Sequence, residues 1–203
     1  MGNEAQCVVK SGARKVAGKA LLETNELIFR SESLRLKIPF SHMESVKAVD
    51  GQLRLQCPDG PLVFELGPFA PKWAEKICNP KSRMEKLGVK RNARVTVIGG
   101  MDPEFEAELT KIAPDFKRGA IAGDTEWIFL ISETQRDLAK ATNIAKVMRG
   151  PVALWIVYPK GRKEITEMDV LNAGRKARLK DIKVISFSST HTALKFVIPV
   201  DKR

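Results

Sequence analysis

Hydrophobic and polar residues alternate in short runs through the first part of the chain. Between the runs lie Gly, Asn, Asp and Ser residues that are typical of turns, and Asp50-Gly51 is the sharpest hairpin signal. Because alternation with a period of two is typical of half-buried strands, this pattern predicts an antiparallel sheet. We expect seven strands, at residues 7–10, 16–22, 26–30, 34–40, 46–49, 53–57 and 62–66.

The pattern changes to a helical one directly after the last of these strands. Trp73 and Ile77 lie four residues apart, and Asn79-Pro80 follows them. Side chains at this spacing share one face of a helix, so the segment is expected to lay an apolar stripe on the sheet or across the mouth of a barrel.

Beyond residue 87, apolar runs alternate with helical patterns, which indicates βαβ units and a mostly parallel sheet. Asp102, Thr134 and Thr166 have the positions of helix N-caps, and Pro103 that of a first helical residue. The last two strands are separated by only a short turn and should form an antiparallel hairpin at the sheet edge. The expected strands cover residues 94–98, 116–122, 127–131, 152–158, 182–187 and 193–200.

This change of period predicts two domains in an α+β chain. The first is a small antiparallel β-barrel or sheet with one carboxy-terminal helix, over residues 1–80. A polar linker is expected at 81–87. The second is a Rossmann-like α/β domain with an antiparallel edge hairpin, over residues 88–203.

Seven short strands followed by one helix resemble the pleckstrin-homology-like barrel, over roughly residues 5–79. Domains of that superfold have lipid-binding, peptide-binding or purely structural roles. The resemblance therefore implies a fold without defining a function.

The second half resembles a small bacterial domain family of unknown function. The stretches that carry this resemblance are LGVKRNARVTVIG at 87–99, ALWIVYPKG at 153–161 and STHTALKFV at 189–197. The element order is also similar to a class I methyltransferase-type Rossmann sheet that lacks one helix–strand unit after its second strand. The resemblance implies a bacterial protein with this fold, and no activity carries over from the family.

Ligands of open α/β sheets bind outside the carboxyl ends of the strands, where the strand order reverses. The expected strand exits and neighbouring loops offer glycines for close backbone approach, carboxylates, a cation and an imidazole. The candidate ligand-binding residues are Gly99, Gly100, Asp124, Glu133, Tyr158, Lys160 and His191. No arrangement of nucleophile and base is visible, so no catalytic residue is assigned.

A class I methyltransferase needs a glycine-rich first loop and an acidic residue at the end of its second strand. The loop at 99–103 has only two glycines, and Asp124 is the nominal acid. Pro103 removes one amide that an anion would need. We therefore expect no cofactor and a non-enzymatic small-molecule-binding or protein-interaction module. The alternative is a divergent S-adenosylmethionine-dependent methyltransferase-like enzyme.

The chain has 35 Lys and Arg against 24 Asp and Glu, for a net charge of +11. The excess is spread along the chain, with clusters at 160–163 and 175–180, and no aromatic residues interleave with the clusters. This distribution argues against specific nucleic-acid recognition, although charge-driven binding stays a third hypothesis. A small anionic ligand or a protein partner is the expectation.

The cysteines at 7, 57 and 78 are odd in number and form no C-x-x-C motif. No signal-peptide pattern is visible, and no apolar run approaches the 18 residues of a membrane span. A reduced cytoplasmic protein without a metal site is expected.

Overall fold

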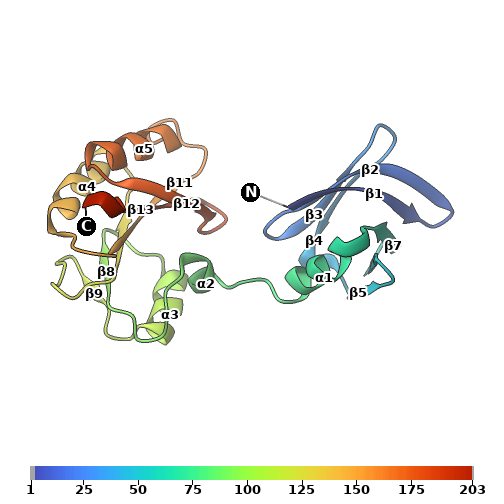
Figure 1. The fold of residues 1–203 in the computed structure, drawn as a ribbon, viewed down its shortest axis with the longest axis horizontal. Coiled ribbons are helices and arrows are strands. Elements are labelled where there is room, and N and C mark those ends of the chain that lie inside the picture. Colours follow the sequence, from blue (N-terminus) through green and yellow to red (C-terminus); the bar gives the residue numbers. More distant parts are fainter. Residues whose placement is uncertain (1–2, 203) are drawn as a thin grey trace. The chain divides into compact units, whose positions relative to one another are not determined.

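The computed structural model describes residues 3–202, which form two compact units (Figure 1). The units comprise Met1–Lys81 and Ser82–Arg203, and each is a mixture of helices and strands. The segment expected to be a linker, 81–87, differs from that expectation. It contains helix α2 (Arg83–Leu87), whose capping box is formed by Ser82 and Glu85, and the helix belongs to the second unit.

The first unit is a curled antiparallel sheet of seven strands in the order β4-β3-β2-β1-β7-β6-β5 (Figure 1). Each expected strand is present, with bounds that differ from the expected ones by at most four residues. The strands are β1 (Asn3–Ser11), β2 (Arg14–Leu22), β3 (Glu26–Arg30), β4 (Arg35–Pro39), β5 (Ser45–Val49), β6 (Gln52–Cys57) and β7 (Gly60–Glu65).

The turn at Asp50-Gly51 joins β5 to β6 as the sequence predicts. Both residues have a positive φ, 49° and 73°, and Val49 pairs with Gln52 across the turn. Two central residues with positive φ match the right-handed twist of the flanking strands.

Helix α1 (Ala70–Cys78) closes one side of the curled sheet and packs on β5 and β6. Trp73 and Ile77 are 1% and 5% exposed, in one apolar core with Leu53 and Phe64. The i, i+4 stripe of this helix is therefore the face that the sheet buries.

The second unit is a mixed sheet of six strands in the order β12-β13-β11-β10-β8-β9. Strands β9, β8, β10 and β11 are parallel, and β13 and β12 form the expected antiparallel hairpin at one edge. The strands are β8 (Val95–Ile98), β9 (Lys117–Arg118), β10 (Trp127–Ile131), β11 (Ala153–Pro159), β12 (Lys180–Ser186) and β13 (His191–Val197).

Helices cover both faces of this sheet. The apolar faces of α4 (Gln135–Val147) and α5 (Glu167–Lys176) join one core, while α2 and α3 (Pro103–Ile112) join another. Alternate residues of β10 belong to the two different cores, because successive side chains of a strand point to opposite faces of the sheet. Its residues Ile128 and Leu130 face α4 and α5, and Phe129 and Ile131 face α2 and α3.

The second expected strand is much shorter than residues 116–122. Only Lys117 and Arg118 pair with β8, at the edge of the sheet. Gly119 follows with a φ of 79°, which turns the chain away from the sheet. The apolar residues after it, Ala120 and Ile121, therefore lie in an irregular segment.

The three expected helix caps are all present. Asp102 accepts a hydrogen bond from the backbone N–H of Phe105 at 2.8 Å, and Thr166 accepts one from that of Asp169 at 3.2 Å. Thr134 forms a capping box with Asp137. These caps fix where α3, α5 and α4 begin and hence where the loops after β8, β11 and β10 end.

Candidate functional site

The strand order of the second unit reverses between β8 and β10. The chain moves from β8 outward to β9, and then returns past β8 to build β10 and β11 on its other side. In open α/β sheets such a reversal opens a crevice outside the carboxyl ends of the two strands. Gly99 and Gly100 leave β8 at this edge, and Glu133 leaves β10.

Gly99 brings the ends of β8 and β10 into close contact. Its φ is 102°, and a Cβ atom at this position would lie 2.5 Å from the carbonyl oxygen of Ile131. No L side chain fits there without a shift of the backbone. Gly100, by contrast, has open space where its Cβ would be.

Glu133 and His191 form an ion-pair contact at the same edge. His191 Nε2 lies 2.9 Å from Glu133 Oε1, and His191 Nδ1 lies 2.9 Å from the Thr190 hydroxyl. An ionised carboxylate only accepts hydrogen bonds, so Nε2 is the donor to Glu133. Arg162 adds a cation, 3.4 Å from Glu133 Oε2.

The ammonium group of Lys160 is occupied by the hairpin between β12 and β13. Lys160 Nζ donates to Ser186 Oγ at 2.8 Å and to the carbonyl oxygen of Ser188 at 2.6 Å, with that of Ser189 at 3.4 Å. Because an ammonium group has three donors, the hairpin satisfies this cation. Lys160 thus holds the hairpin in place at this edge.

Tyr158 points into the core and away from the crevice. Its side chain is 4% exposed and belongs to the core beneath α4 and α5. Burial, together with the nearby Glu167 carboxylate 3.4 Å from its hydroxyl, raises the pKa of Tyr158 well above its usual range. A buried phenol that stays neutral is a packing group at this position.

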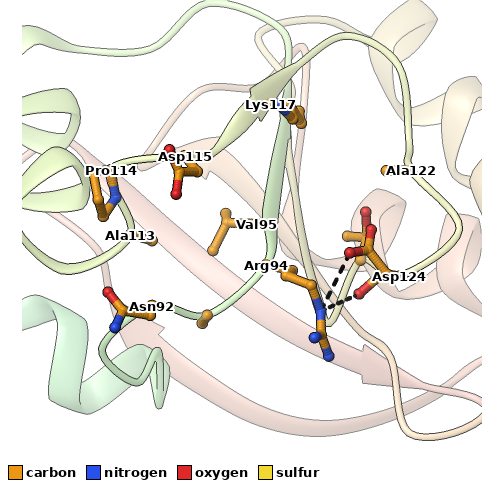
Figure 2. Close-up of a pocket in the computed structure, with 11 residues that line it drawn as sticks. Asn92, Arg94, Val95, Ala113, Pro114, Asp115, Lys117, Ala122 and Asp124 are labelled. Atoms are coloured by element: carbon orange, nitrogen blue, oxygen red, sulfur yellow. Dashed lines mark hydrogen bonds and ion pairs between the residues drawn. The ribbon is translucent and has the colours of Figure 1, made fainter.

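The structure does not bring Asp124 together with the other candidates. Asp124 precedes β10 and lies at the amino ends of the strands, beside Arg94, which precedes β8 (Figure 2). Arg94 Nε donates to the backbone carbonyl of Asp124 at 2.7 Å and lies 3.7 Å from its carboxylate. The residues that follow β9 at the carboxyl edge are Gly119 and Ala120, so the acid of the methyltransferase pattern is lacking there.

Figure 2 shows the cavity beside Asp124, of about 170 Å³. It lies between the segment that enters β8 and the segment that follows α3. Its polar groups include Asn92, Asp115 and Lys117. The cavity is small beside the ligand sites of about 300–1,000 Å³ that are usual for small molecules.

Two further residues at this edge, Ser132 and Arg162, lie outside the seven candidate residues, although Ser132 stands at an expected strand exit and Arg162 in the basic cluster at 160–163. Ser132 is fully buried, and its hydroxyl has no hydrogen-bond partner among the residues that the structure describes. Arg162 contacts Glu133, as described above. In the sequence, Ser132 is marked by its position directly after a strand, and Arg162 by its position directly after Gly161.

Within residues 3–202, no three or more His, Cys, Asp or Glu side chains are grouped so that they would hold a metal ion. No helix in that range is both long and apolar enough to cross a membrane.

No protein-family model matches the chain, and no curated protein matches it by sequence. Among solved structures, it is similar to a TehB-like S-adenosylmethionine-dependent methyltransferase from Corynebacterium glutamicum, with 12% identity, a TM-score of 0.38 and coverage of 64% of this chain and 96% of that one. It is also similar to LepI in complex with S-adenosylmethionine, with 13% identity, a TM-score of 0.42 and coverage of 64% and 53%. It is similar as well to the pyocyanin biosynthetic protein PhzM, with 11% identity, a TM-score of 0.41 and coverage of 64% of this chain and 58% of that one. These likenesses carry no statement about activity.

Proposed function

We propose that the second unit binds a small ligand at the exits of β8 and β10. The observation that carries this proposal is the reversal of strand order at the point where Gly99 lies against Ile131. A crevice at a strand-order reversal is where ligands of open α/β sheets bind. Gly100 adds a backbone surface that no side chain covers.

In place of the small anionic ligand expected from the sequence, the carboxylate acceptors at this edge favour a ligand whose nearest group donates hydrogen bonds. Asp102 caps α3, and Glu104 and Glu106 lie in its first turn; Arg83 pairs with Asp102 and Glu104, and Arg118 pairs with Glu106. Glu133 adds a carboxylate at the end of β10, and the hairpin occupies the ammonium group of Lys160. An anionic group would meet these carboxylates, whereas ligand hydroxyl or amino groups would donate hydrogen bonds to them.

Ser132 supplies the remaining polar group. Its buried hydroxyl lacks a partner in the described part of the chain, and such a group costs about 1–3 kcal/mol when left unsatisfied. The proposed polar contacts are therefore Ser132, Glu133 and His191.

S-adenosylmethionine-dependent methyl transfer is the second candidate function. The strand order favours it, because it is that of a class I methyltransferase sheet without one helix–strand unit after the second strand. The cationic sulfonium group of this cofactor also suits an acidic crevice. Against it stands the absence of an acidic residue directly after β9, where Gly119 and Ala120 follow.

The test is amide chemical-shift mapping of the full chain with a panel of small ligands that includes S-adenosylmethionine and S-adenosylhomocysteine. We expect shifts at residues 98–102, 131–134 and 188–191 for at least one ligand. Gly100→Val should abolish them, because it places a side chain in open space at the crevice. The matched control is Gly123→Val, which also adds a side chain in open space, beside Asp124.

The two candidates give different results. Shifts with S-adenosylmethionine at roughly millimolar concentration or below would support methyl transfer. Shifts with other ligands alone would support ligand binding at this edge and would exclude S-adenosylmethionine-dependent methyl transfer. A panel that shifts no amide at this edge, or shifts that survive Gly100→Val, would overturn the proposed site.

We further propose that the first unit is a pleckstrin-homology-like domain with an interaction role in the cytoplasm of a bacterium. The strand order and the position of α1 across the curled sheet support this assignment. Pull-down with the isolated range 1–81 against the same range carrying Trp73→Ala tests whether a partner depends on the folded unit.

A further inference from the structure

A cavity of about 550 Å³ lies between the carboxyl ends of α4 and α5. The two helices end at Val147 and Lys176, just before the chain enters β11 and β12. The cavity is therefore at the amino ends of the parallel strands, at the opposite edge of the sheet from the crevice at Gly99. Its volume lies within the range of about 300–1,000 Å³ that small-molecule sites occupy.

Five cationic side chains line this cavity, and the described residues around it include no Asp or Glu. None of the five forms an ion pair with any carboxylate in residues 3–202. The cations are Lys146, Arg149, Lys176, Arg178 and Lys202.

The helix ends do not account for this much positive charge. Each helix carboxyl end carries the equivalent of about half a negative charge, so the pair offsets about one cation. Arg149 serves the end of α4, since its guanidinium donates to the carbonyl oxygens of Lys146 and Met148 at 2.7 Å. The other four cations have no carboxylate partner among residues 3–202.

Arg178 has a backbone conformation that favours a different residue. Its φ is 60°, and it ends α5 with the hydrogen bond from the Leu179 N–H to the Gly174 carbonyl, at 3.0 Å. This is the position where helices usually carry glycine, because a left-handed conformation costs other residues about 1 kcal/mol. Arginine in this place keeps a cation at the cavity at a cost in stability.

The floor of the cavity is apolar. Met148, Ala177 and Leu179 are 2%, 9% and 7% exposed, and Ala145 and Ile198 complete the lining. A cationic rim above an apolar floor suits a ligand that joins anionic groups to a flat apolar part.

We propose that this cavity binds a nucleotide, with its phosphates at Lys146, Lys176 and Arg178 and its base on the floor formed by Met148 and Leu179. Guanidinium and ammonium groups are the usual partners of phosphate oxygens, and the apolar floor provides a surface for a base. This proposal is independent of the ligand proposed at Gly99, because the two sites share no residue.

Isothermal titration of the full chain with ATP, inorganic tripolyphosphate and adenosine tests the proposal, at a salt concentration of about 0.15 M, where the screening length is about 8 Å. We expect ATP to bind, tripolyphosphate to bind more weakly, and adenosine not to bind detectably. Arg178→Gly and Lys146→Ala should each weaken ATP binding by about fivefold or more, since each removes a charged hydrogen-bond donor. Arg178→Gly also relieves the strained backbone, so loss of folding cannot explain its loss of binding.

The matched control is Arg175→Ala, which removes one cation from the same last turn of α5 but from outside the cavity. It should change ATP affinity by less than about twofold, because exposed charges at a distance are screened by salt. An equal loss in Arg175→Ala would indicate general attraction of polyanions and overturn the proposal. Absence of ATP binding, or tripolyphosphate binding as tightly as ATP, would overturn it as well.

Discussion

His191 Nε2 lies 2.9 Å from Glu133 Oε1, although the two residues are 58 positions apart in the chain. The contact joins the end of β10 to the first residue of β13 and passes the end of β11, which lies between them in the sheet. It therefore ties the antiparallel hairpin to the parallel strands at the edge where we propose that a ligand binds.

Breaking this contact should weaken the second unit slightly. Glu133→Gln and His191→Gln should each lower the free energy of unfolding by about 0.5–1 kcal/mol, because the pair is partly exposed. The double variant should lose about as much as either single one, which a double-mutant cycle in urea measures. Additive losses would contradict the contact. Glu164→Gln, an exposed change nearby, is the control and should be neutral.

Gly99→Ala should destabilise the fold strongly. The added Cβ would lie 2.5 Å from the Ile131 carbonyl oxygen at a φ of 102°, so both a steric clash and a backbone penalty apply. We expect a loss of about 2 kcal/mol or more in urea unfolding. Gly100→Ala adds its methyl group in open space and should change the free energy of unfolding by less than about 0.5 kcal/mol. Equal effects of the two variants would contradict the close approach of β8 and β10.

Arg83 anchors α2 to α3, and its removal should be costly. The side chain is 8% exposed, its guanidinium donates to Glu108 at 2.9 and 3.1 Å, and it lies 5.0 Å from the ring centre of Phe187. Arg83→Ala should lower the free energy of unfolding by about 1–3 kcal/mol, because it removes a buried guanidinium that packs on Phe187 and bonds twice to Glu108. Arg83→Lys should lower the free energy of unfolding by a smaller amount, since a lysine cannot form the bidentate contact with Glu108. The exposed Arg91→Ala is the control, and a similar loss there would contradict the anchoring role.

The three cysteines should differ in reactivity. Burial raises the pKa of the Cys7 thiol to about 11 and also raises that of Cys57, whereas Cys78 is exposed. A raised pKa leaves little thiolate at pH 8, so Cys7 should begin to react only as the pH approaches its pKa. Labelling with a thiol reagent at pH 8 should show one fast thiol, which Cys78→Ser removes. Unfolding in urea should expose all three, and fast labelling of Cys7 in the folded chain would contradict its burial.

Local patterns in the sequence were sufficient to predict most elements. The strands at 26–30 and 127–131 have the predicted bounds, because alternation or a continuous apolar run ends there at turn residues. Asp102 and Thr166 cap their helices as predicted, since a cap depends only on residues within one turn. From β8 onward, the expected order of strands and helices is also the observed one.

Other features depended on contacts between distant segments. The predicted strand at 116–122 has only two paired residues, because pairing at a sheet edge is not encoded in the apolar content of the strand alone. The range 81–87 is polar in sequence, yet it forms a helix because Met84 and Leu87 find a core to enter and Arg83 meets carboxylates on α3.

The candidate site was predicted in part. Gly99, Gly100, Glu133, Lys160 and His191 all lie at or beside the carboxyl edge of the sheet, as the ends of parallel strands and one hairpin turn require. Asp124 lies at the opposite edge, because β9 ends early and the chain crosses back before that residue is reached.

The sequence by itself determined the periodicity, the caps and turns, and the order of elements, since these depend on residues close together along the chain. The tertiary structure alone decided how the charges are used. In the folded chain, Lys160 bonds to the hairpin and Glu133 contacts His191. Cations from five positions line one cavity: Lys146, Arg149, Lys176, Arg178 and Lys202. The reason is that a charge takes its role from the groups within a few ångströms, and folding brings those groups from distant parts of the chain.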